Sequence, residues 1–308
     1  MKCFDALRAK YYYSRIRNPK QWGWFSRDPD GDVLDALHEV GIAKYYYSRI
    51  RNPKQWGWFS WDPDDDVLDA LHEVGIETQE MSITPSEYHT YFEKAEYRTR
   101  YPEYYPENLH EKSLEHFIAQ ELLQFTPDDV FIDIASQKSP AFRIYERLYG
   151  CRTYAQDLSY EPGIHGRRIG SSAESLPVPD AFATKLALHC SFEHFEGDSD
   201  IGFVREATRV LQVGGAFVIV PLYLSLRYSI VTDILCSGPQ HTKFERDATI
   251  FAVRGWKNCH SRFYDAAHLR KRIIQNASGL QIAIIYIKNR SDIHSSCYAR
   301  FALLARRL

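Results

Sequence analysis

Short apolar runs alternate with amphipathic stretches over most of the chain. The runs predict strands over residues 130–134, 153–158, 167–170, 182–188, 216–222, 281–287 and 298–304. Apolar positions at helical spacing predict helices over residues 109–125, 140–149, 201–211 and 265–277. Alternation of this kind is typical of a mostly parallel sheet that helices cover on both sides. The pattern therefore predicts a Rossmann-like α/β fold, with a seven-stranded, mostly parallel sheet in a three-layer α/β/α domain.

The last two predicted strands are too close together for a helical crossover. Residues 288–297 separate them and show no helical pattern. Parallel neighbours need a crossover of roughly a dozen residues or more, whereas antiparallel strands can be joined by a short turn. We therefore expect the last strand to be antiparallel.

The chain before residue 109 contains a nearly verbatim tandem duplication. Residues 10–42 recur as residues 44–76, and the copies differ only at Arg27/Trp61 and Gly31/Asp65. Each copy reads as an aromatic, basic segment followed by one helix. We expect residues 1–43 to be redundant and only the second copy to contact the main domain.

The remaining domain boundaries follow from the same pattern. Residues 44–108 are expected to form a helical, aromatic-rich extension, either a lid over a substrate or simple packing against residues 109–308. The main domain is expected to span residues 109–308.

Composition and charge exclude several classes of partner. The 308 residues carry a net charge of -2, which gives no overall attraction to nucleic acid or membrane. The six cysteines are scattered without a CxxC pair, which favours a reducing compartment. The start of the chain lacks an apolar signal core, and the longest apolar run, 216–224, is too short to span a bilayer. We expect a cytoplasmic protein, with its oligomeric state open.

Candidate chemistry gathers after the first two strands of the predicted sheet. Asp133 ends the first strand and is followed by a small-residue loop, and Asp157 ends the second strand. Ligands of doubly wound sheets bind beyond the carboxyl ends of the strands. Asp133 could equally cap the loop, and Asp157 could instead form a turn.

Four motifs, in order along residues 109–308, resemble class I S-adenosylmethionine-dependent methyltransferases of the small-molecule branch. They read SSAESLPVPD over residues 171–180, HCSFEHF over 189–195, EATRVLQVGG over 206–215 and RFYD over 262–265. The resemblance implies S-adenosylmethionine as cofactor. It also implies that the cofactor contacts are Asp133, Ala135, Ser136, Gln137, Asp157, Ser172, Ala173 and His189.

The first loop departs from the family pattern. The family's three glycines are replaced by Ala135, Gln137 and Ser139, and Ser172 stands where an aspartate is common. Glycine permits positive φ angles and close backbone approach to the ligand. Gln137 adds a long side chain where the methionine part of the cofactor is expected. Asp157 fits the family, because an acid there can accept hydrogen bonds from both ribose hydroxyls.

The candidate bases are His189, His194 and His260. A base is needed only if the acceptor is a weak acid such as a hydroxyl. His189 could instead be a structural histidine, and the pair Glu193-His194 could simply begin a helix. Arg262 and His260 belong to a basic cluster that either binds an anion or is a solvated face. No metal site is expected, because the His-Glu pairs lack the second histidine of an HExxH helix.

The leading hypothesis is therefore methyl transfer, in line, from S-adenosylmethionine to a small molecule. The alternative is a methyltransferase-like module that has lost catalysis and binds or regulates. A nicotinamide-dependent oxidoreductase is a second alternative, but the chain has no Tyr-x-x-x-Lys pair and no glycine fingerprint after a strand.

Overall fold

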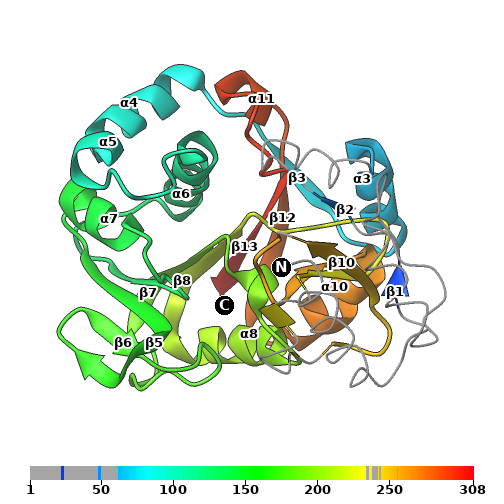
Figure 1. The fold of residues 1–308 in the computed structure, drawn as a ribbon. Coiled ribbons are helices and arrows are strands. Elements are labelled where there is room, and N and C mark those ends of the chain that lie inside the picture. Colours follow the sequence, from blue (N-terminus) through cyan, green and yellow to red (C-terminus); the bar gives the residue numbers. More distant parts are fainter. Residues whose placement is uncertain are drawn as a thin grey trace, which may run out of the picture. The chain divides into compact units, whose positions relative to one another are not determined.

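The computed structural model describes residues 22–23, 48–49, 62–233, 236–237, 242, 244–254 and 256–308 (Figure 1). The chain divides into two compact units. The larger unit comprises Asp64–Phe192, Asp198–Tyr223 and Ala266–Leu308. The smaller unit takes in Met1–Pro63, Glu193–Gly197 and Leu224–Asp265.

The larger unit is built on one eight-stranded sheet. Its strands lie in the order β3 (Thr78–Met81), β12 (Leu280–Ile287), β13 (Phe301–Arg307), β8 (Leu211–Val220), β7 (Ala183–His189), β4 (Val130–Asp133), β5 (Arg152–His165) and β6 (Arg168–Gly170). β13 is antiparallel to both of its neighbours, and the other neighbouring pairs are parallel. The predicted Rossmann-like fold and its antiparallel last strand are confirmed.

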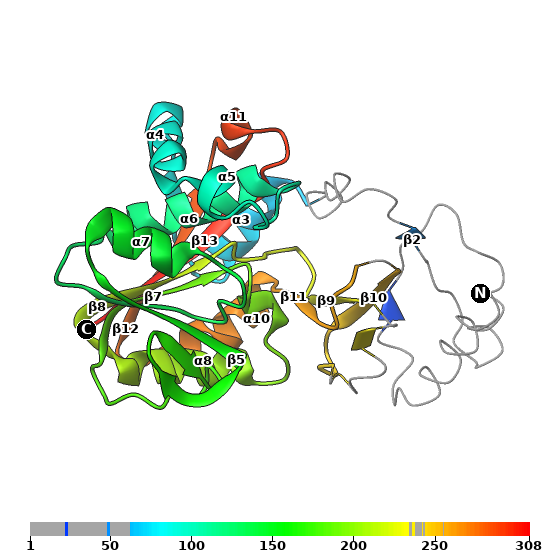
Figure 2. The same ribbon diagram turned by 60° about the vertical axis from the view of Figure 1, so that its left-hand side comes forward.

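Helices cover both faces of this sheet (Figures 1 and 2). α6 (Leu109–Leu123) and α7 (Ala141–Tyr149) lie on one face, and α4 (Pro85–Ala95) packs on both of them. α8 (Ser199–Val210) and α10 (Ala266–Arg272) lie on the other face, with α3 (Asp64–Glu73) beside α10. The short helices of this unit are α5 (Tyr97–Arg100), α11 (Arg290–Ile293) and the 3-10 turn η4 (Ile274–Asn276).

The central strands are buried because they are apolar on both faces. In β4, Phe131 and Ile132 have no exposed surface, and the same holds for Phe217 and Val218 in β8. Burial of apolar side chains between two helical layers is the main force that stabilises such a sheet. The apolar runs that predicted these strands are therefore also the core.

β5 is longer than predicted because it folds back beside β6. Ala155 to Asp157 pair with Arg168 to Gly170, and Ile164 and His165 then pair with Ile169 and Arg168. The close approach needs a glycine at position 170, since a Cβ there would lie 1.9 Å from the carbonyl oxygen of Glu161. The folded-back part brings Tyr160 toward the loop that follows β4.

Two parts of the fold were not predicted. β3 adds an eighth strand from the segment expected to be helical, and the single-turn helix α11 lies in the connection before β13. The smaller unit has its own sheet of β9 (Ser229–Thr232), β10 (Thr249–Arg254) and β11 (Ser261–Phe263), seen in Figure 2. These strands are three to six residues long. Such short runs carry too little alternation to be told from a loop.

Both copies of the duplication contribute backbone to the smaller sheet. β1 (Trp22–Gly23) pairs with Ile250 and Phe251 of β10, and β2 (Ser48–Arg49) pairs with Val253 and Arg254. The sequence predicted contact from the second copy alone. The redundancy of residues 1–43 stays a prediction.

Deletion of residues 1–43 should leave the unfolding of the larger unit unchanged. The buried apolar residues described for that unit begin at Val67, so none of them lies in the deleted segment. Urea unfolding of both chains, followed by far-UV circular dichroism, measures this. A lower midpoint for the main transition of the shortened chain would contradict the expectation.

Candidate functional site

The loop after β4 contains two residues in a backbone conformation that favours glycine. Ala135 has φ 50° and Gln137 has φ 45°, so both lie in the left-handed region. A residue with a Cβ pays roughly 1–2 kcal/mol to adopt this conformation. Two left-handed residues within three positions are stable only if contacts with the surrounding protein fix their conformation. The loop thus holds two left-handed residues although it contains no glycine.

Gln156 and Asp157 supply the bonds that hold this loop. The backbone N–H groups of Ala135 and Ser136 donate to Gln156 Oε1 (3.0 Å) and to the Gln156 carbonyl (2.8 Å). The N–H of Gln137 donates to Asp157 Oδ2 at 2.9 Å. Gln156 Nε2 in turn donates to the Ser171 carbonyl at 2.5 Å, which ties the loop to the segment after β6.

Asp157 is therefore a loop anchor and a turn former at once. Its Oδ1 accepts from the N–H of Ser159 (2.8 Å) and from Ser159 Oγ (2.7 Å). An ionised carboxylate has about four acceptor sites, and these bonds with that from Gln137 use three. Tyr160 closes the arrangement by donating its hydroxyl to the Gln137 carbonyl at 2.8 Å. One acceptor site of Asp157 is left for a ligand.

Asp133 and His189 meet below the loop in a fully buried pair. His189 Nδ1 lies 2.9 Å from Asp133 Oδ1, and each side chain is 1% exposed. Because a carboxylate only accepts, His189 donates from Nδ1. Asp133 Oδ2 is buried and has no hydrogen-bond partner within the described part of the chain. Unsatisfied buried acceptors are rare, so this oxygen marks where a ligand group would be stabilised.

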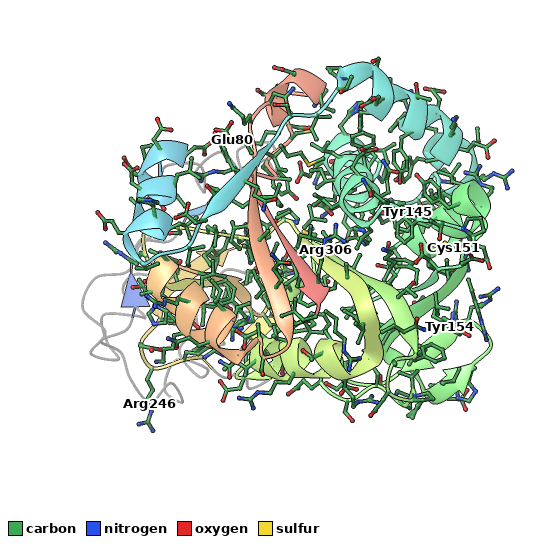
Figure 3. All side chains as sticks on the ribbon, turned by 180° about the vertical axis from the view of Figure 1, so that it is seen from behind. Glu80, Tyr145, Cys151, Tyr154, Arg246 and Arg306 are labelled. Atoms are coloured by element: carbon green, nitrogen blue, oxygen red, sulfur yellow. The ribbon has the colours of Figure 1, made fainter. Side chains whose placement is uncertain are left out.

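A tyrosine–histidine network backs this pair. The Tyr145 hydroxyl lies 3.3 Å from His189 Nε2 and donates to the His116 carbonyl at 2.7 Å. Tyr145 is on α7, on the same side of the sheet as α6 (Figure 3). The His116 ring nitrogens lie 2.7 Å from the Tyr97 hydroxyl and 3.1 Å from the Tyr104 hydroxyl. Burial, then the neighbouring His189 and Lys112, lowers the pKa of His116 well below its usual value, so this ring is neutral.

The other two candidate bases belong to the smaller unit. His194, in the 3-10 turn η3 (Phe192–His194), has Nδ1 2.6 Å from the His260 carbonyl, and its side chain is 38% exposed. His260 is buried, with Nδ1 3.1 Å from the Glu193 carbonyl and Nε2 3.6 Å from Glu245 Oε2. The structure brings these two histidines together and gives each a backbone carbonyl as partner.

Arg262 does not lie on a solvated basic face. Its side chain is fully buried and pairs with Glu245 and with the Gly197 carbonyl. Burial alone would raise the pKa of Glu245, but His260 and Arg262 lower it to about 2. The interpretation of Arg262 as a solvated residue was wrong, because its charge is neutralised within the smaller unit.

Ser172 and Ala173 follow the anchor point at Ser171. Ser172 Oγ accepts from the Glu174 N–H at 3.3 Å, and Ala173 is 7% exposed. Gln156 thus links both predicted parts of the cofactor site, the loop after β4 and the segment after β6.

Three charged residues of α6 were missed by sequence reasoning. Glu111, Lys112 and Glu115 are all buried, and Lys112 Nζ lies 2.8 Å from Glu115 Oε1. In the sequence HEKSLEH they resemble a solvated helix face. The only available signal was their place on the helix that leads into the strand ending in Asp133.

Neither a metal centre nor a membrane span is found in the described part of the chain. Within it, no three His, Cys, Asp or Glu side chains gather closely enough to hold a metal ion. None of its helices is both long and apolar enough to cross a bilayer.

Among the comparisons with known proteins, only the one with solved structures finds similar proteins. No protein-family model matches the chain, and neither does any curated protein. A 1,6-didemethyltoxoflavin-N1-methyltransferase of Burkholderia thailandensis, solved with S-adenosylhomocysteine, is 12% identical with a TM-score of 0.45, over 73% of this chain and 91% of that chain. A putative methyltransferase of Haloferax volcanii, solved in complex with the activator Trm112, is 12% identical with a TM-score of 0.42, over 79% and 96% of the two chains.

A geranyl diphosphate C-methyltransferase of Streptomyces coelicolor is 13% identical with a TM-score of 0.40, over 64% of this chain and 76% of that chain. Similarities this low carry no conclusion about activity. The order of the strands in the larger unit, with β13 antiparallel, is by itself that of a Rossmann-like α/β fold.

Replacement of Gln137 by glycine should stabilise the protein. Glycine removes the left-handed strain, partly offset by its greater freedom in the unfolded chain, so the free energy of unfolding should rise by roughly 0.5–1 kcal/mol. Lys138→Gly is the matched control, because Lys138 has no positive φ. Glycine there relieves no strain, so the free energy of unfolding should fall by roughly 0.5–1 kcal/mol. Denaturant unfolding of both variants tests this, and a destabilised Gln137→Gly variant would count against the strain.

His116 should make the protein sensitive to mild acid. Its folded pKa lies below that of the unfolded chain, about 6.5, so below that pH only the unfolded chain gains the proton. The free energy of unfolding should therefore fall by up to about 1.4 kcal/mol per pH unit from this group. His116→Gln should flatten the fall between pH 6.5 and 5, whereas Ser113→Ala on the same helix should not. Equal slopes for wild type and His116→Gln would refute the assignment.

Proposed function

We propose that the protein is an S-adenosylmethionine-dependent methyltransferase acting on a small molecule by in-line transfer. The observation that carries this proposal is the left-handed pair Ala135 and Gln137 in the loop after β4. Strain of this kind at the carboxyl edge of a doubly wound sheet is typical of a ligand site. Selection for folding alone would favour glycine at both positions.

The residues around the loop fit the cofactor. Asp133 Oδ2 is a buried acceptor without a partner among the described residues, and Asp157 has one acceptor site left. In this proposal Asp157 holds the ribose, and the backbone of Ala135, Ser136 and Gln137 lies against the methionine part. Ser172 and Ala173, tied to the loop through Gln156, flank the adenine.

The chemistry asks little more of the protein than alignment. The sulfonium of the bound cofactor supplies a methyl group that is already activated for transfer. Orientation and exclusion of water then account for much of the rate. His189 stands behind Asp133 and fixes the direction of its carboxylate, since its Nδ1 bonds Oδ1 and leaves Oδ2 open.

The remaining parts of the chain have places in the same proposal. Residues 109–308 carry the cofactor site, residues 44–108 form the extension or lid, and residues 1–43 are redundant. A cytoplasmic location goes with the described cysteines, which are all free thiols.

A non-catalytic binding or regulatory module is the second candidate. The observation that favours it is that the N–H groups of Ala135, Ser136 and Gln137 are already bonded within the protein. These donors are then not available to a ligand. Such a module would keep the fold and lose the affinity for the cofactor.

Calorimetric titration with S-adenosylmethionine and S-adenosylhomocysteine separates the two candidates. We expect both to bind the wild type, and Asp157→Ala to weaken binding roughly tenfold or more through lost hydrogen bonds to the ribose. Ser159→Ala is the matched control, because it removes a bond to Asp157 without removing the carboxylate. Absence of binding to the wild type at millimolar cofactor would refute the methyltransferase and favour the module.

A further inference from the structure

The beginning of α6 carries a buried ammonium group. The Lys112 side chain is 6% exposed, and its Nζ lies 2.8 Å from Glu115 Oε1 and 5.3 Å from the centre of the Tyr105 ring. Glu111, one residue before Lys112, is 0% exposed. Burial of charged groups is costly unless their remaining donors and acceptors are satisfied. Stability alone therefore does not explain why these charged groups are buried.

Hydrogen-bond donors remain unused in this cluster. The ammonium of Lys112 has three N–H donors, and Glu115 Oε1 is its one acceptor among the described residues. Glu111 Oε2 accepts from the N–H of Tyr298 (2.7 Å) and of Ala299 (3.4 Å), while its buried Oε1 has no partner in the described part of the chain.

The protonation of Glu111 turns its free oxygen into a donor. Burial, together with Glu115, raises the pKa of Glu111 to about 8, so the group is neutral at pH 7. Since Oε2 already accepts two N–H groups, the proton belongs on Oε1. Among the residues that the structure describes, an O–H of Glu111 and two N–H groups of Lys112 then have no acceptor, and all three donors come from one helix turn.

Aromatic rings and the carboxyl edge of the sheet surround these donors. Tyr298, whose N–H bonds Glu111, stacks on Tyr223 with ring centres 6.5 Å apart. The Tyr223 hydroxyl lies 3.5 Å from the sulfur of Cys190, the residue after β7. Tyr105 is 48% exposed above Lys112 and has φ 43°. The cluster thus lies where ligands of such sheets bind, between flat apolar walls.

We propose that Lys112 and Glu111 bind the carboxylate of an aromatic acid, which is the acceptor of the methyltransferase proposed above and on which this assignment rests. A carboxylate accepts from both groups, and its hydrogen bonds with the Lys112 ammonium are charge-assisted. Rings such as Tyr298 and Tyr105 suit an aromatic body. An exposed tyrosine over a buried lysine is also a contact that the acceptor can displace on entering.

Binding of benzoate tests the proposal without any methyl transfer. Titration calorimetry on the full chain should show that benzoate binds and that its neutral isostere benzamide binds roughly tenfold more weakly or not at all. The double variant Lys112→Met/Glu115→Gln removes both charges together, so that no unpaired charge stays buried. It should lose benzoate binding by a similar factor, while Lys112→Arg, which keeps the charge, should retain it.

Lys271→Met on α10 is the control for an exposed lysine and should bind benzoate as the wild type does. Equal binding of benzoate and benzamide, or no binding of benzoate to the wild type, would overturn the proposal. Both comparisons use the wild type, so they hold even if the double variant fails to fold. Benzoate binding without cofactor binding would keep this site and reject the methyltransferase; the reverse would keep the methyltransferase alone.

Discussion

The enclosure of α6 is the constraint on which the larger unit depends. This helix lies between the sheet and a layer of tyrosines from α4, α5 and the turn before α6, so nine consecutive residues from Glu111 to Ala119 are buried. A helix that is buried all round and carries polar groups must pair them inside the protein. The neutral ring of His116 is paired with Tyr97 and Tyr104, and the ammonium of Lys112 with Glu115. The aromatic segment before residue 109 is thus part of the interior that α6 requires.

The loop after β4 shows how a sheet can keep a strained path by other means than glycine. Glycine makes the left-handed conformation cheap locally. Here Ala135 and Gln137 adopt this conformation at a higher energetic cost, and hydrogen bonds with Gln156 and Asp157 offset it. Each of these bonds is worth about 1 kcal/mol, comparable with the strain. The same bonds occupy donors that a ligand would use, so rigidity and affinity compete at this loop.

The sequence sufficed for most of the larger sheet, because its strands depend on local patterns. It also named Gln137 and Asp157 as candidate residues, and a hydrogen bond joins them. Other partners could not be predicted in this way, because the bond between Gln156 and Ala135 joins β5 to the loop after β4. The burial of Lys112 was hidden because a charged helix turn looks solvated until its surroundings are known. The smaller sheet was not predicted, because its strands are short and pair segments that are distant in the sequence.

Two polar networks include residues of α6, one around His116 and one around Lys112. Lys112 and His116 are four residues apart, so they lie on neighbouring positions of one helical face. Through Tyr145, His116 reaches the pair His189–Asp133 at the end of β4 and β7. Beside Lys112, Glu111 accepts from the N–H of Tyr298, which lies before β13. A rotation or shift of α6 would disturb both networks at once. If the protein is the proposed methyltransferase, the helix would therefore set the distance between the proposed acceptor and cofactor sites, on which in-line transfer depends.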